Sequence, residues 1–280
     1  MPILLLTFFA CEEKPVEDSG FFDIVIDNSN SDTEDTEEKD DTAIEEPVPD
    51  TSDLTLIGTY TDDALVTHTI TEELWDAGPE RIFNISQFDN LSGFLIAQNG
   101  EANNPQYGNP ERWSKFQWYN TENGELFYCQ SISDAESEDA ALTANANVAD
   151  LSLGCAGSPW TEIRSSMDLN GDFVDGGGEP HSINPFAWAI GTAPSLFQIE
   201  EYSNDDDYAL AQNDSANGSA PGLYSKFEWT TDADGVWFYC HSTFEATSID
   251  DAKGATADRE DLLTGCNTNP WTSLTQNSPR

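Results

Sequence analysis

Apolar and polar residues alternate along most of the chain after residue 53, in short runs separated by turn residues. A period of two is typical of β-strands that bury one face. The runs predict six strands, over Leu54–Tyr60, His68–Trp75, Phe83–Ile85, Phe94–Gln98, Phe116–Trp118 and Phe127–Cys129. Asn123-Gly124 stands between the last two runs and predicts a hairpin turn, because both residues tolerate positive φ. The Ala-rich segment 137–146 then predicts a short helix.

This pattern occurs twice in the chain. Ser114–Ile163 aligns with Ser225–Leu274 at a constant offset of 111 without a gap, and 22 of the 50 positions are identical. The match continues upstream at offsets of 113 and 114. We therefore expect two tandem homologous modules, near residues 54–166 and 167–276. Each should be mainly β, an antiparallel meander of about six strands that is able to close into a small barrel, with one short helix.

The cysteines repeat with the modules. Cys129 and Cys155 lie 26 residues apart in the first copy, and Cys240 and Cys266 lie 26 apart in the second. A four-cysteine metal site is the alternative, but single cysteines at this distance lack the paired spacing that zinc favours. Pairing within a copy keeps each module self-contained, so we expect the disulfides Cys129–Cys155 and Cys240–Cys266.

The first eleven residues carry a different signal. Met1–Ala10 is almost wholly apolar and is followed directly by Cys11. This segment resembles bacterial lipoprotein signal peptides, although no Lys or Arg precedes Cys11 and Phe8 and Phe9 are unusual there. The resemblance implies a signal peptide over residues 1–10, lipidation of Cys11 and a lipid anchor in a membrane of the bacterial cell envelope. Glu12 stands where some inner-membrane lipoproteins carry Asp, which favours the outer membrane.

The modules are also similar to one that is repeated in uncharacterised bacterial surface lipoproteins. That resemblance covers most of residues 54–276 and implies a location facing the periplasm or the exterior, without implying a chemistry. The intervening segment, residues 12–53, holds 17 acidic residues and two lysines. Such a composition predicts a disordered tether after the lipidated Cys11, with Phe21–Ile26 as the one apolar patch that could pair with a sheet edge or a partner.

Charge excludes one class of partner. The chain has 53 Asp and Glu against 10 Lys and Arg, a formal net charge of −43. A protein of this charge cannot bind a phosphate backbone by counterion release, so we expect no nucleic-acid partner. The acidity has two interpretations, weak binding of cations or of a basic partner, and simple solubility in salty water.

Polar residues shared by both copies are the candidates for ligand binding. The equivalent histidines lie on predicted strands, and the other pairs carry amide or ammonium groups. The candidates are His68, Gln98, Asn99, Lys115, His181, Gln212, Asn213 and Lys226. Each has an alternative structural interpretation, as a buried hydrogen-bonding residue, a turn former or a solvated strand residue.

Other site chemistries find little support. Asp168–Asp172 begins like a calcium loop but has Phe173 where the loop needs Gly, so no metal and no cofactor are expected. A nucleophile elbow is absent from the sequence, whereas paired carboxylates for glycoside cleavage stay open. We therefore expect a membrane-anchored lipoprotein, not an enzyme, with two modules that bind a glycan or a protein. The alternative is a hydrolase of envelope or extracellular polymer.

Overall fold

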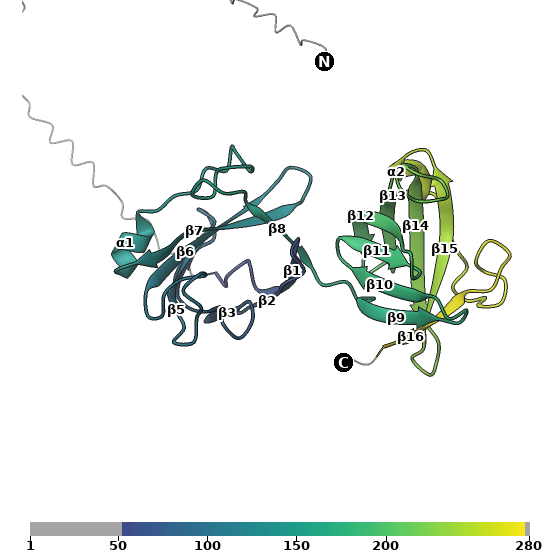
Figure 1. Cartoon of the computed structure of the whole chain (residues 1–280), viewed down its shortest axis with the longest axis horizontal. Coiled ribbons are helices and arrows are strands. Elements are labelled where there is room, and N and C mark those ends of the chain that lie inside the picture. Colours follow the sequence, from purple (N-terminus) through teal and green to yellow (C-terminus); the bar gives the residue numbers. More distant parts are fainter. Residues whose placement is uncertain (1–51, 278–280) are drawn as a thin grey trace, which may run out of the picture. The chain divides into compact units, whose positions relative to one another are not determined.

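The computed structural model describes residues 52–277, and Figure 1 shows two antiparallel β-barrels in tandem. The predicted signal peptide, Cys11, nearly all of the predicted tether and the Phe21–Ile26 patch lie outside the described residues. Each barrel is closed and contains eight strands in chain order. The expected class, two similar mainly β modules with a short helix and a disulfide each, is confirmed.

The first barrel takes its strands from residues 58–165. In order along the chain its elements are β1 (Gly58–Asp62), β2 (Thr67–Ile70), β3 (Leu74–Asp76), β4 (Ile82–Asp89), β5 (Phe94–Asn99), β6 (Trp113–Asn120), β7 (Leu126–Ala135), α1 (Glu138–Leu142) and β8 (Thr161–Ser165). Every strand pairs with the next one, and β8 pairs with β1 to close the barrel. The fold is therefore an up-and-down meander.

The second barrel repeats this order over residues 171–276. Its elements are β9 (Gly171–Asp175), β10 (Pro180–Asn184), β11 (Ala187–Ile190), β12 (Ser195–Ser203), β13 (Tyr208–Asn213), β14 (Tyr224–Thr231), β15 (Trp237–Ala246), α2 (Ile249–Lys253) and β16 (Thr272–Gln276). Pairing of β16 with β9 closes this barrel. The second barrel therefore contains the same order of elements as the first.

The number of strands differs from the expected six for two local reasons. The run His68–Trp75 is two strands, β2 and β3, because the Thr71 hydroxyl accepts hydrogen bonds from the N–H groups of Glu73 and Leu74 and turns the chain. The strand β8 was not predicted, since Ile163 is its only apolar residue. Conversely, Leu54 and Leu56 are buried in the core but precede β1.

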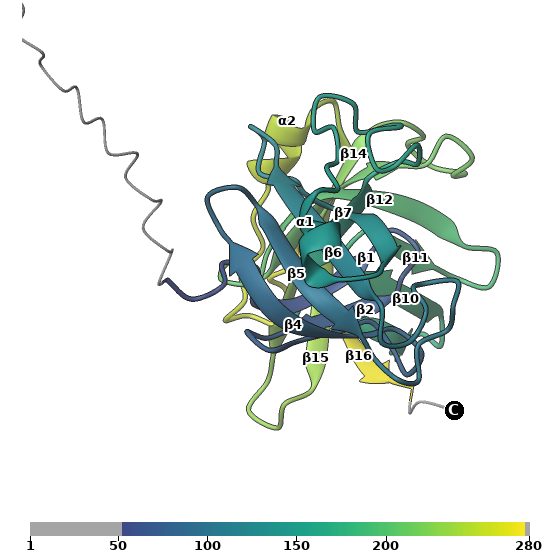
Figure 2. The same ribbon diagram turned by 90° about the vertical axis from the view of Figure 1, so that its left-hand side faces the viewer.

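Figure 2 shows β4, β5 and β6 side by side in the wall of the first barrel. Large aromatic side chains fill the interior of each barrel. In the first barrel Trp75 stacks on Phe116 with ring centroids 4.5 Å apart, and Phe83 meets Phe116 edge-on at 4.8 Å. Trp188 stacks in the same way on Phe227 in the second, at 4.3 Å. An eight-stranded barrel is just wide enough for its side chains to fill it, and these aromatic residues do so.

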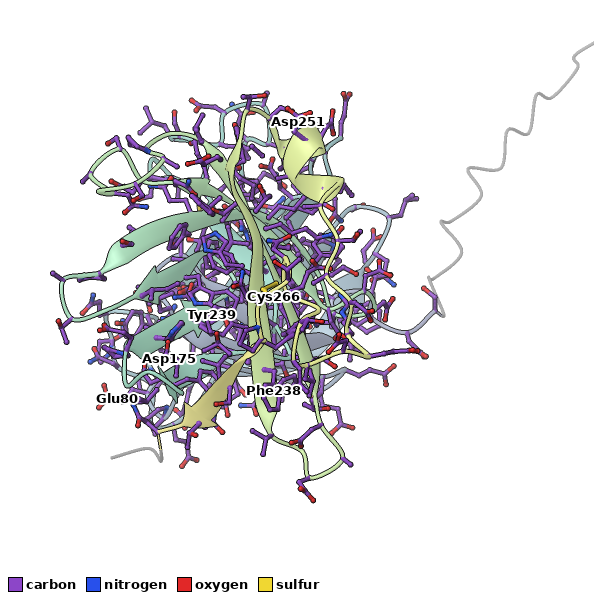
Figure 3. The ribbon with its side chains drawn as sticks, turned by 90° about the vertical axis from the view of Figure 1, so that its right-hand side faces the viewer. Glu80, Asp175, Phe238, Tyr239, Asp251 and Cys266 are labelled. Atoms are coloured by element: carbon purple, nitrogen blue, oxygen red, sulfur yellow. A yellow bond between two sulfur atoms is a disulfide. The ribbon has the colours of Figure 1, made fainter. Side chains whose placement is uncertain are left out.

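The disulfide and the helix lie at equivalent places in both copies. Cys129 on β7 bonds to Cys155, as expected. Cys240 on β15 bonds to Cys266, also as expected, and Figure 3 labels Cys266. Each bond ties the loop that follows the helix to the last long strand. The predicted hairpin turn is also confirmed, with Gly124 at φ 86°, and the equivalent turn of the second copy has Gly235 at φ 78°. Neither described helix is long and apolar enough to cross a membrane.

Candidate functional site

His68, the first candidate, lies inside the first barrel in a chain of hydrogen bonds. The Trp75 indole N–H donates to His68 Nδ1 at 2.9 Å, so the proton of the neutral ring lies on Nε2. Nε2 faces Asp62 Oδ2 at 3.1 Å, and Asp62 also accepts the backbone N–H of Val66 at 2.7 Å. Burial lowers the pKa of His68, although the Asp62 carboxylate acts to raise it.

A buried Asp–His pair resembles the general base of a hydrolase, but its geometry here differs. Both ring nitrogens of His68 bond within the protein, and the residue is 1% exposed. A general base needs one ring nitrogen within reach of a substrate proton. The arrangement instead links β1, β2 and β3 at one place in the barrel wall.

The second barrel repeats the arrangement with one difference. Trp188 donates to His181 Nδ1 at 2.9 Å, but His181 Nε2 lies 3.6 Å from Asp175 Oδ2 and is buried without a hydrogen-bond partner. The Asp175 carboxylate also accepts the N–H groups of the Gly-rich turn that follows it, at Gly177 and Glu179. Asp175 lies close to Tyr239 (Figure 3), and burial together with the Asp175 charge raises the pKa of Tyr239 to about 12.

Asn99 and Asn213 each anchor a buried polar cluster that holds a loop. Asn99 Oδ1 accepts the Ser114 hydroxyl at 2.6 Å, and its amide donates to the carbonyls of Asn109 and Ser133 at 2.9 and 2.8 Å. Asn213 bonds to Ser225 at the same distance and to two equivalent carbonyls. The buried amide groups are thereby satisfied, and the loop before β6 or β14 is fixed against the barrel.

The third member of this cluster differs between the copies. Gln130 donates to Ser114 Oγ at 2.9 Å in the first barrel. His241 Nε2 lies 2.9 Å from Ser225 Oγ in the second, with its ring flat on Phe227 at 4.3 Å. Because the Ser225 proton goes to Asn213, His241 Nε2 must be the donor, which is the reverse of a serine nucleophile with its base. Burial lowers the pKa of His241 to about 4.

Lys115 and Lys226 hold the helices on the outer wall. Lys115 Nζ donates to the carbonyls of Leu142 and Ala144, at 3.0 and 2.7 Å, at the C-terminal end of α1. Lys226 does the same for α2, with Ala255 O at 2.6 Å. Carbonyls at a helix C-terminus lack partners within the helix and attract a cation. Burial lowers the pKa of Lys115.

Gln98 and Gln212 complete the eight candidates. Gln98 Nε2 donates to the Glu111 carbonyl at 3.2 Å, and Gln212 Nε2 donates to the Gly222 carbonyl at 3.4 Å. All eight side chains therefore have a partner within the protein. Their role in ligand binding stays a prediction, and the structure shows a structural role for each. The aspartates of the Asp–His–Trp chains were not predicted as functional, although the repeat aligns Asp62 with Asp175 and Trp75 with Trp188.

A groove of about 920 Å³ lies on the second barrel, over β9, β10 and β11 and beside the end of β16. Of the eight candidates, only His181 borders it. Five exposed polar side chains also border it, those of Asp172, Ser182, Thr192, Gln276 and Asn277. No sequence signal marked them, since exposed polar residues on strands are ordinary.

Residues 52–277 contain no group of three or more His, Cys, Asp or Glu side chains arranged to hold a metal ion. The segment that begins like a calcium loop leads into β9, and the Asp168 N–H donates to the Asn204 side chain at 2.9 Å.

Comparison of the chain with known proteins finds no matching family model, no matching curated protein and no matching solved structure.

Proposed function

We propose that this protein is a lipoprotein of the bacterial cell envelope, anchored through Cys11, whose two barrels bind ligands without catalysing a reaction. The observation that carries the proposal is the pair of disulfides at identical positions in the two copies. Structural disulfides persist in exported proteins and are rare in the cytosol, where thiols are kept reduced. An apolar N-terminus that ends at Cys11 supplies the matching export and anchoring signal.

Two features support binding rather than catalysis. The histidine that resembles a general base in the first barrel bonds through both ring nitrogens to Asp62 and Trp75. The serine that hydrogen-bonds to a histidine in the second barrel, Ser225, is fully buried and gives its proton to Asn213. Aromatic side chains also fill both barrel interiors, so a ligand would reach the outer surface of a barrel rather than its inside.

Fractionation of cells that express the full chain tests the anchor. The wild-type protein should sediment with membranes, because a lipid modification with several acyl chains anchors a protein stably. A single acyl chain gives only marginal binding to a membrane. The Cys11→Ser variant should appear in the soluble fraction, with its disulfides unchanged. If this variant stayed in the membrane fraction as fully as the wild type, Cys11 would not be the anchor.

A further inference from the structure

The groove on the second barrel lies on the outer side of three paired strands. Ser182 on β10 pairs with Asp172 on β9 and with Ala189 on β11, so these three residues form one row across the sheet. His181 and Ile183, the neighbours of Ser182 along β10, are buried, whereas Ser182 is exposed. The row therefore faces outward, and the β11–β12 turn with Thr192 and Pro194 borders the groove.

The polar side chains at the groove have unused hydrogen-bonding capacity. Asp172, Ser182, Thr192, Gln276 and Asn277 make no side-chain hydrogen bond to any other residue within 52–277. The eight candidates discussed above, in contrast, are all engaged. Two hydroxyls, two amides and one carboxylate together offer donors and acceptors in a mixture. Such a mixture complements ligand hydroxyl groups, which both donate and accept.

The charge of the residues at the groove limits the charge that its ligand can carry. Asp172 is the only carboxylate that borders it, and no Lys or Arg is among its bordering residues. An anionic ligand would meet no cation there and would approach a chain of formal net charge −43. The groove therefore suits an uncharged ligand.

The apolar part of the groove consists of small residues, Pro180, Ala189 and Pro194, with Gly171 and Gly191. The first barrel has the same row of outward positions, with Thr59 paired to Thr69 and Thr69 paired to Asp76. Asp76 thus stands where the second barrel has Ala189, and its carboxylate accepts the Gly78 N–H at 2.8 Å. The second barrel has the methyl group of Ala189 in place of this carboxylate, so an apolar surface lies between its polar side chains.

We propose that this groove of the second barrel binds a neutral saccharide. A sugar ring presents hydroxyl groups around its edge and C–H groups on its faces, which match the polar side chains and the Pro and Ala surface. The volume lies within the range of about 300–1,000 Å³ that is typical of small-molecule sites. This inference rests on the proposed binding function and gives the second barrel its ligand class.

A glycan array with neutral oligosaccharides of glucose, galactose, mannose and N-acetylglucosamine tests this inference, with the full chain and both disulfides formed. The best sugar is then titrated into the wild type and two matched variants by calorimetry. Ser182→Trp fills the groove, whereas Thr69→Trp places the same side chain at the equivalent exposed position of the first barrel. We expect a dissociation constant at least tenfold higher for S182W and an unchanged one for T69W.

Amide NMR spectra of the same titration locate the sugar independently of the variants. The N–H signals of Ser182, Ala189 and Gly191 should shift, and those of Thr69 and Asp76 should not. Three outcomes would overturn the inference: no neutral sugar binds, S182W binds the sugar as tightly as the wild type, or binding is equally weak in both tryptophan variants. If the protein is anchored through Cys11 but binds no sugar, the inference about the ligand class is refuted, whereas the proposed lipid anchor stands.

Discussion

His241 should make the second barrel sensitive to acid in a way that the first barrel is not. Its ring lies flat on Phe227 and donates to Ser225, and burial lowers its pKa from 6.5 to about 4. A histidine whose folded pKa lies below its unfolded value binds fewer protons in the folded state. Stability is therefore fully present above pH 6.5 and is lost as the pH falls toward 4.

The size of this effect follows from the two pKa values. A complete shift of this size corresponds to about 3 kcal/mol, since one pKa unit is about 1.4 kcal/mol. At pH 5 only part of the shift is expressed, which gives about 2 kcal/mol. The residue is partly reached by solvent, which reduces the burial penalty, so we expect a loss of about 1–2 kcal/mol between pH 7 and pH 5.

The natural control is the residue at the same place in the first barrel. Gln130 makes the equivalent hydrogen bond to Ser114 at 2.9 Å and does not titrate. His241→Gln should therefore keep the donor and remove the part of the pH dependence that His241 contributes. Urea unfolding followed by tryptophan fluorescence at pH 7 and pH 5 gives the free energies. Gln130→His should introduce a similar acid sensitivity into the first barrel.

The comparison isolates His241 because His68 and His181, whose pKa values are also lowered by burial, are the same in wild type and variant. If H241Q lost as much stability as the wild type between pH 7 and pH 5, the imidazole would not be desolvated in the way that the structure shows.

Three further predictions concern the stability of each barrel. Replacing Cys129 and Cys155 together by Ala should destabilise the first barrel by about 3 kcal/mol, with a smaller effect on the second, in calorimetric unfolding of the full chain. Equal effects on both barrels would contradict a disulfide that acts within the first barrel. Lys115→Met should cost about 1–3 kcal/mol in urea unfolding, because the carbonyls at the C-terminal end of α1 lose a buried charged donor. Lys253→Met, at an exposed residue, should cost clearly less, and similar losses for the two variants would refute the role of Lys115. The melting temperature should rise as NaCl increases from about 0.05 to 1 M, because salt screens the repulsion in a chain with 53 acidic and 10 basic residues. A fall in the melting temperature would exclude charge repulsion as a destabilising effect.

The features that the sequence predicted correctly are those that depend on local pattern or on the repeat. The Asn123-Gly124 turn needs only the local backbone preference of its residues, and it is a turn between β6 and β7. The disulfides follow from the 26-residue spacing in both copies and the need of each copy to close on itself. Strands with several alternating apolar residues, such as β6, are also found where they were expected.

The features that were missed depend on contacts between distant segments. Strand β8 has one apolar residue, and it is a strand because β1 and β7 offer it free edges. Asp62 could not be distinguished from the other acidic residues until β2 placed His68 beside it. The groove depends on Ala189 lying next to Ser182, which is a property of strand register rather than of the sequence along the chain.

Mass spectrometry of the full chain, expressed in a bacterium and isolated from its membrane fraction, tests the proposed function most directly. Non-reduced peptides should contain Cys129 bonded to Cys155 and Cys240 bonded to Cys266, and the N-terminal peptide should begin at Cys11 with the mass of a lipid modification. Free thiols at these four cysteines, together with an unmodified Cys11 inside an intact N-terminal peptide, would contradict an exported and lipid-anchored protein.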